Sequence, residues 1–248
     1  MEHALPILVA PFVGSFLGVV VQRLPAGRSI VRGRSGCDRC GRRLGVLELV
    51  PLVSWVAQRG RCRGCGGRIG LFEPAIELAA MAVAAWAVLA GSEVAAVWGN
   101  CLLGWCLLAL GWIDARHKRL PDAITLPLIS GGLAVTLWLD RSAILVHALG
   151  AIVGFLLFYG LSAGYRRLRG REGLGGGDAK LLAAGGAWVG ADQLAPLILL
   201  AAVSAITCVL ASTVLRNQVP TMTIAIPFGP FLGAAIWLVR LYGQATQI

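Results

Sequence analysis

Apolar residues in this chain form long uninterrupted runs, and polar residues gather in the segments between them. A helix needs about 20 apolar residues to cross a bilayer. Seven runs are of that order, and they cover 4–22, 72–90, 94–113, 123–139, 142–165, 194–215 and 222–241. A shorter run, 179–191, follows the same pattern and brings the count to eight. The pattern therefore predicts an all-α polytopic membrane protein with about eight transmembrane helices.

The composition agrees with this prediction. The 248 residues are 57% hydrophobic and 14% charged, and the mean hydropathy is +0.77. A soluble domain would carry about 25% charged residues. The first run, 4–22, is not typical of a cleaved signal peptide, because no basic segment precedes it and no small-residue cleavage site follows it. We expect this run to remain as the first transmembrane helix.

The positive charge is distributed asymmetrically. If the runs alternate in direction, 20 of the 22 lysines and arginines fall on one side of the membrane, with only Arg141 and Arg240 on the other. Eleven of them lie between Arg23 and Arg68. The positive-inside rule then makes the loop 23–70 cytoplasmic and places both termini outside. Orientation and contact with anionic membrane lipids account for this charge, so nucleic acid is not an expected partner.

The predicted cytoplasmic loop contains two Cys-x2-Cys pairs that are separated by 21 residues: Cys37, Cys40, Cys62 and Cys65. Two such pairs are typical of a tetrahedral zinc site. Disulfides are the alternative, and a cytoplasmic location disfavours them. Four protein ligands leave no open position, so we predict a structural zinc. The chain then divides into a first transmembrane helix (1–22), a small zinc-binding loop domain (23–70) and a transmembrane domain (71–248).

Two aspartates, Asp114 and Asp178, stand at the ends of apolar runs on the predicted cytoplasmic side. Acidic residues at membrane depth are costly and indicate function. Two carboxylates at one depth can share a site in which one is ionised and the other holds a proton. Such a pair can activate a water and protonate a leaving amine, as in aspartic proteases. The alternatives are an ion pair of Asp114 with Lys118 and an N-cap role for Asp178.

Asp178 belongs to the stretch GLGGGDAK, residues 173–180, whose glycines do not have the spacing of a phosphate-binding loop. Without Cβ atoms, these glycines leave room for backbone and water beside the aspartate. An N-cap role also explains Asp122, and the segment Pro227–Pro230 is either a kink or an unwound stretch that offers its backbone to a peptide. The residues expected to support the site are Gly175, Gly176, Gly177, Lys180, Asp122, Pro227 and Gly229.

Several segments resemble the prepilin peptidases (type IV leader peptidases) of bacterial type IV pilus and type II secretion systems. They are GSFLGVVVQRLP, the cysteine loop with VPLVSW and RGRCRGC, IDARHKRLPDAITLPL, and GLGGGDAKLLAAGGAWVG followed by IPFGPFLG. The resemblance implies a GxGD-type aspartic protease of the inner membrane, with Asp114 and Asp178 as its catalytic pair. Such an enzyme removes the short basic leader of a prepilin or pseudopilin, after a glycine, at the cytoplasmic face. Many members also methylate the new N-terminus with S-adenosylmethionine, through the part that contains the cysteine loop.

The chain differs from the common family pattern at Gly18, at Asp38-Arg39 and in the stretch from Glu48 to Pro51. All of these positions lie in the N-terminal part, so they bear on methylation rather than on proteolysis. Two other classes remain as alternatives. An ion-coupled transporter would place its acidic residues along an ion path near the membrane midplane. A non-catalytic zinc-containing membrane assembly protein would need its cysteines but not its aspartates.

Overall fold

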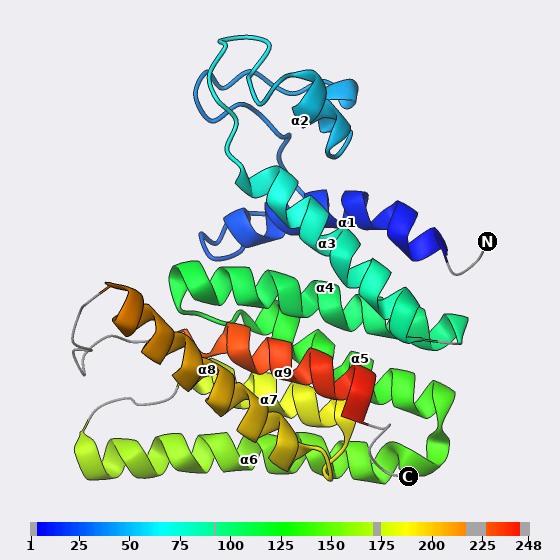
Figure 1. The fold of residues 1–248 in the computed structure, drawn as a ribbon, viewed down its shortest axis with the longest axis vertical. Helices are drawn as coiled ribbons and strands as arrows, with labels where there is room; N and C mark the ends of the chain where they lie inside the picture. Colours follow the sequence, from blue (N-terminus) through cyan, green and yellow to red (C-terminus); the bar gives the residue numbers. More distant parts are fainter. Residues whose placement is uncertain (1–3, 92, 171–174, 217–226, 244–248) are drawn as a thin grey trace. The chain divides into compact units, whose positions relative to one another are not determined.

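The structure is a computed structural model that describes residues 4–91, 93–170, 175–216 and 227–243, and most of them are helical (Figure 1). The long helices are α1 (Leu5–Arg23), α3 (Phe72–Ala90), α4 (Val94–His117), α5 (Asp122–Leu139), α6 (Ile144–Arg169) and α8 (Leu194–Arg216). The shorter elements are α2 (Val53–Ala57), α7 (Gly176–Val189), α9 (Gly229–Tyr242) and the 3-10 turns η2 (Val46–Leu49) and η3 (Arg141–Ala143).

Six helices within the described residues are long and apolar enough to cross a membrane, which confirms the all-α polytopic membrane prediction. Helices α7 and α9 have 14 residues each, or about 21 Å at the rise of an α-helix. They are shorter than the hydrocarbon core of about 30 Å. The count of eight spans therefore stays a prediction, and residues 222–226 of the last predicted run lie outside the described residues.

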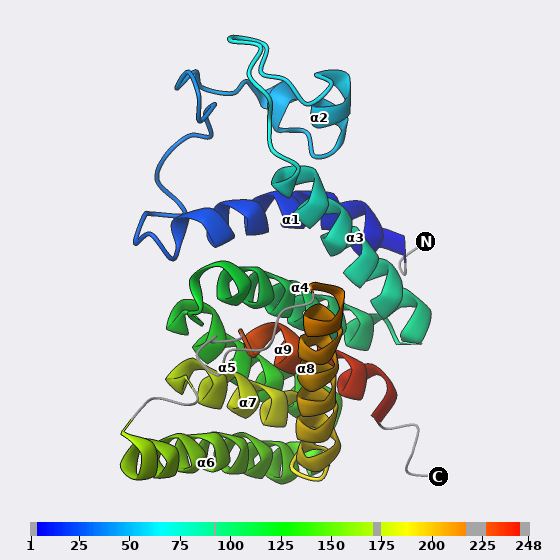
Figure 2. The ribbon, with the colours of Figure 1, turned by 60° about the vertical axis from the view of Figure 1, so that its left-hand side comes forward.

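The chain forms two compact units, residues 1–105 and 106–248, whose boundary falls within α4. In the first unit α1 and α3 pack along each other. Gly14 permits their close approach, because a Cβ at this position would lie 2.6 Å from the Cα of Glu77. The cysteine loop connects these two helices and carries η2 and α2 (Figure 2).

Helix α7 is the buried element of the second unit, and its side chains from Leu181 to Val189 are all buried. It packs chiefly against α6, which lies beside it in both views (Figures 1 and 2), and also against α5 and α9. The backbones of α6 and α7 nearly touch, since a Cβ on Gly186 would lie 2.1 Å from the carbonyl oxygen of Gly150. Small residues allow helices in a membrane to approach this closely. A helix too short to cross the bilayer is thus enclosed by its neighbours.

Candidate functional site

The two cysteine pairs form two knuckles with the same backbone pattern. In each knuckle the N–H of the first cysteine, Cys37 or Cys62, donates to the carbonyl five residues later, and its own carbonyl accepts from the N–H four residues later, at 2.8–2.9 Å. The residue four places on is Gly41 in one knuckle and Gly66 in the other, with φ of 69° and 66°. Glycine adopts this left-handed conformation without steric cost, so the sequence specifies both turns.

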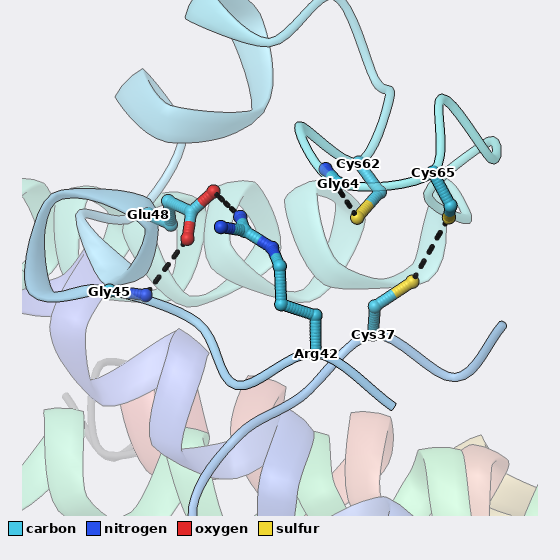
Figure 3. Close-up of polar contacts among 7 residues, drawn as sticks. All are labelled: Cys37, Arg42, Gly45, Glu48, Cys62, Gly64 and Cys65. Carbon is cyan, nitrogen blue, oxygen red and sulfur yellow. Dashed lines mark hydrogen bonds and ion pairs between the residues drawn. The ribbon is translucent and has the colours of Figure 1, made fainter. Parts of the chain in front are cut away.

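The knuckles bring the four predicted metal ligands together. The Sγ atoms of Cys37, Cys40, Cys62 and Cys65 all lie within 4.8 Å of one another. Cys37 and Cys65 come from different knuckles, and their sulfurs are 3.9 Å apart (Figure 3). Tetrahedral zinc with Zn–S bonds of about 2.3 Å would separate its sulfurs by about 3.8 Å. The four sulfurs therefore fit a metal such as zinc.

The environment of Cys62 favours the ionised thiol that a metal requires. Hydrogen bonds from the backbone N–H groups of Cys65 and Gly64 lower the pKa of Cys62 to about 6. The N–H of Gly64 lies 3.4 Å from the sulfur (Figure 3). Because zinc binds thiolates and displaces their protons, a lowered pKa eases binding near neutral pH.

Glu48 fixes the turn that follows the first knuckle. Its carboxylate accepts a hydrogen bond of 2.8 Å from the N–H of Gly45 and forms an ion pair with Arg42 (Figure 3). The Gly45 N–H and the guanidinium of Arg42 hold the pKa of Glu48 below its usual value. The Glu48 side chain is only 7% exposed, so this contact lies against the protein rather than in open solvent.

Asp114 lies in the last turn of α4 and is 5% exposed. Its Oδ2 accepts a hydrogen bond of 2.9 Å from the N–H of Gly229, the first residue of α9. The backbone is so close that a Cβ on Gly229 would lie 2.7 Å from this oxygen. The predicted alternative, an ion pair with Lys118, is absent although both residues are described; Lys118 donates its backbone N–H to the carbonyl of Asp114, at 2.8 Å. A hydrogen bond from the start of α9, rather than a direct ion pair, therefore holds this carboxylate.

Asp178 is partly buried in the first turn of α7. Gly175 is the N-cap of this helix and accepts the N–H of Asp178 at 3.0 Å, so the N-cap interpretation of Asp178 is wrong. The charges of Asp178 and Asp114 interact, although 64 residues separate them in the sequence. Both predicted carboxylates therefore lie in the second unit, near enough for their charges to interact. Gly173, at the start of the glycine stretch, lies outside the described residues.

The glycines before Asp178 have different surroundings. A Cβ on Gly177 would lie 2.8 Å from the Cβ of Leu120, so this glycine allows α7 to approach the segment before α5. A Cβ on Gly175 would lie 3.4 Å from Oδ2 of Asp178, whereas one on Gly176 would meet no described atom within 4 Å. Among the described residues, Gly176 therefore has open space where a side chain would be, and its expected role beside the aspartate stays a prediction.

The remaining predicted residues lie at the ends of the same helices. Lys180 on α7 is ion-paired with Asp122 at the start of α5, with 2.6 Å between Nζ and Oδ1. The N-cap of α5 is Pro121, so the N-cap interpretation of Asp122 is wrong. Pro227 precedes α9, so the segment Pro227–Pro230 is a helix start rather than a kink inside a helix. The ends of α4, α5, α7 and α9 together carry the predicted site residues.

The structure shows a cavity in the first unit that was not predicted from the sequence. It has a volume of about 360 Å³ and lies between α1, the start of α3 and the cysteine loop. Trp55 and Gln58 line this cavity. They are three residues apart, which places them on one side of a helical turn, and this spacing is the one sequence pattern that could have indicated them. Gly18, Asp38 and Glu48, at the three places where the chain differs from the common family pattern, line the same cavity.

The fold and the aspartates define a class: a polytopic helical membrane protein in which helix ends hold two interacting carboxylates. Comparison with known proteins specifies the family. A model described as "Bacterial Peptidase A24 N-terminal domain" matches residues 8–90, and one described as "Type IV leader peptidase family" matches residues 101–210. The chain belongs to the type IV leader peptidase family.

The curated relatives include three proteins named prepilin leader peptidase/N-methyltransferase. The one from Burkholderia pseudomallei (strain 1026b) is 39% identical over 94% of this chain and 83% of its own length. The one from Aeromonas hydrophila is 35% identical over 99% of this chain and 94% of its own. The one from Pseudomonas aeruginosa is 34% identical over 96% of this chain and 89% of its own. No solved structure matches. These relatives do not favour a transporter or a non-catalytic assembly protein.

Proposed function

We propose that this protein is an aspartic endopeptidase that removes the short basic leader of type IV prepilins or pseudopilins and then methylates the new N-terminus. The observation that carries the proteolytic part is the electrostatic interaction between Asp114 and Asp178, which lie at the ends of α4 and α7. Membership of the family and the names of the relatives support the substrate class and the methyl transfer.

In the proposed reaction the two carboxyl groups share one proton and one water. The ionised carboxylate takes a proton from the water, whose oxygen forms a bond to the scissile carbonyl carbon. The protonated carboxyl gives its proton to the nitrogen as the C–N bond breaks, so protons and charge balance. The Gly229 N–H, 2.9 Å from Asp114 Oδ2, stabilises the ionised form and fixes its orientation.

The other predicted residues position this pair. The ion pair of Lys180 with Asp122 ties the first turns of α7 to the start of α5. Gly177 also allows the start of α7 to approach the segment before α5, because its missing side chain leaves room for Leu120. Gly175 and Gly176 leave space for a peptide beside Asp178. In this proposal none of these residues exchanges a proton with the substrate.

The four cysteines of the loop fit zinc by donor type and by the spacing of their sulfurs. Zinc bound there would join the two knuckles and fold a loop that is too small to form its own core. S-adenosylmethionine would supply the methyl group for the second reaction. The placement of the arginines supports a multi-pass protein of the inner membrane with loop 23–70 and both aspartates towards the cytoplasm, in contact with anionic lipids and with no role for nucleic acid.

Prepilin cleavage by purified Asp114→Asn and Asp178→Asn variants tests the proteolytic part. Each should lower the cleavage rate by about 10²-fold or more, because an amide cannot exchange the proton. Asp192→Asn, which changes an exposed aspartate of the same unit, is the matched control and should cleave like the wild type. Substantial cleavage by either of the first two variants, with the control active, would show that the aspartates are not the catalytic pair.

A further inference from the structure

Three residues that line the cavity of the first unit carry buried polar atoms without partners. Nε1 of Trp55, Oε1 of Gln58 and Oε2 of Glu73 are buried, and among the described residues none of them has a hydrogen-bond partner. All three residues line the cavity. Leaving such an atom without a hydrogen bond is energetically unfavourable. An occupant of the cavity that bonds with these atoms removes this cost, and the volume of about 360 Å³ is within the range of small-molecule sites.

The wall of the cavity is held in place by surrounding contacts. The chain enters α2 through a tight turn at Leu52, where φ is 59° and the N–H of Val53 donates to the carbonyl of Pro51 at 2.6 Å. This turn is strained for a residue other than glycine. The carboxylate of Glu77 accepts the N–H of Leu52 at 2.7 Å and anchors the turn to α3. Strained residues that the surrounding structure holds in place are frequent at functional sites.

The ring of Trp55 and the carboxylate of Glu73 are positioned as well. Gly60 lies against the indole, since a Cβ there would be 3.0 Å from Cζ2 of Trp55. Oε1 of Glu73 accepts a hydrogen bond of 3.1 Å from the side-chain amide of Gln22, whereas Oε2 has no partner among the described residues. An occupant must therefore offer at least one acceptor, to Trp55, and donors for Gln58 and Glu73.

The charges around the cavity further restrict which ligands with these donors and acceptors can bind. Four carboxylates and three arginines line it, namely those of Asp38, Glu48, Glu73, Glu77, Arg23, Arg28 and Arg34. A phosphorylated nucleotide would add several negative charges to a lining that already has an excess of carboxylates. A ligand with a sulfonium and an ammonium group, one carboxylate, sugar hydroxyls and a base with acceptor nitrogens matches both the charges and the unpartnered atoms.

We propose that this cavity is the methyl-donor site, and that Trp55, Gln58 and Glu73 bind S-adenosylmethionine there. The proposal rests on the methyl-transfer part of the proposed function and adds the location and the residues. Trp55 N–H donates to a ligand acceptor, and Gln58 Oε1 and Glu73 Oε2 accept from ligand hydroxyl or amino groups. The cysteine loop supplies Trp55 and Gln58, so its knuckles hold one wall of the site.

Binding measured directly tests this assignment without relying on methylation. Calorimetric titration of the purified full-length protein in detergent with S-adenosylmethionine and S-adenosylhomocysteine should show saturable binding, and ATP should show none. Trp55→Phe and Glu73→Gln should each weaken binding about tenfold or more. In the glutamine variant an NH2 group replaces one of the two carboxylate oxygens, so an acceptor is lost either at the position that faces Gln22 or at the position of Oε2. A thermal unfolding midpoint close to that of the wild type shows that a variant is folded. If one of the two variants does not fold, the other is enough for the test.

The matched controls are Trp86→Phe and Glu93→Gln, the same changes at residues of the first unit that do not line the cavity. They should bind with wild-type affinity. Unchanged affinity in both cavity variants overturns the assignment. Wild-type protein that cleaves prepilin but binds neither adenosyl compound also overturns it and leaves the peptidase intact. Binding by a protein that cleaves no prepilin would instead count against the proteolytic part of the proposed function.

Discussion

Gly229 contributes to the aspartate site in two ways. Its N–H donates to Asp114, and the absence of a side chain lets that oxygen come within 2.7 Å of where a Cβ would be. Sequence reasoning marked the Pro227–Pro230 segment as unusual but left its role open between a kink and exposed backbone. The structure shows the start of a helix, whose N–H groups and dipole favour a carboxylate.

Gly229→Ala should therefore impair cleavage while the protein remains folded. The added methyl group would displace the carboxylate, and a displacement of about 1 Å can lower a catalytic rate by about 10²-fold. Gly233→Ala on the same helix is the control, because its Cβ would meet Leu107 at an ordinary 3.8 Å. The measurement is kcat/KM for a prepilin peptide. Equal rates for the two variants would mean that Gly229 does not position Asp114.

At the scale of helices, the close contact of α6 with α7 determines where Asp178 lies. Gly150 and Gly154 on α6 form a row of small residues against the backbone of α7, at Gly186 and Leu182. Nothing in the hydropathy pattern distinguishes these glycines from others in the apolar runs. They allow a short helix to be buried, and the start of that helix carries the aspartate.

Gly186→Ala should lower the stability of the protein. Its Cβ would lie 2.1 Å from a backbone oxygen, and such overpacking typically costs about 1–3 kcal/mol. Gly160→Ala on α6 meets no atom within 4 Å and should be neutral or stabilising by up to about 1 kcal/mol, since alanine favours the helix. Thermal unfolding midpoints in detergent would compare them. A Gly186→Ala protein as stable as the wild type would contradict the close packing.

In the cysteine loop, the local sequence specifies the turns, whereas long-range packing specifies how the two knuckles assemble. Each turn is specified by its own glycine, but the approach of Cys37 to Cys65 joins two knuckles that are far apart in the sequence. Metal binding is expected to contribute much of the free energy that folds this loop.

Purified wild-type protein should contain about one zinc per chain, since four thiolates bind one ion. Cys62→Ser should lose the zinc and leave the loop open to limited proteolysis between its arginines. Cys208→Ser, which changes an exposed cysteine of α8, should keep both the zinc and the resistance. Elemental analysis and protease digestion provide the two readouts. Full zinc content in Cys62→Ser would rule out the four-sulfur site.

At the scale of the whole molecule, the position of the arginines predicts the orientation in the membrane. A membrane-impermeant maleimide should modify Ser142→Cys, between α5 and α6, in spheroplasts, because this turn is on the predicted outer side. Arg32→Cys, in the cysteine loop, should react only after permeabilisation. Both side chains are exposed on the protein surface, so a difference in labelling reports the side of the membrane and not burial. The opposite labelling pattern would reverse the topology and place the aspartates on the outer side.

The sequence alone determined features that depend on composition and on local spacing. Hydropathy specified the membrane-protein class, because crossing a bilayer requires a length of apolar residues that few other structures need. The Cys-x2-Cys spacing with its glycines specified the metal knuckles, because turn geometry is local. The positions of Asp114 and Asp178 at the ends of apolar runs led to the prediction of a shared site, which stays a prediction.

Only the tertiary structure decided which groups surround these residues. The N-cap interpretations of Asp178 and Asp122 failed because Gly175 and Pro121 precede their helices, and Asp122 pairs instead with a lysine 58 residues away. The binding of Asp114 by the N–H of Gly229 joins residues 115 positions apart. The cavity at Trp55 and Glu73 likewise forms from segments that meet only when α1, α3 and the loop pack together. Local pattern encodes which residues can form a site, and long-range packing decides which atoms they contact.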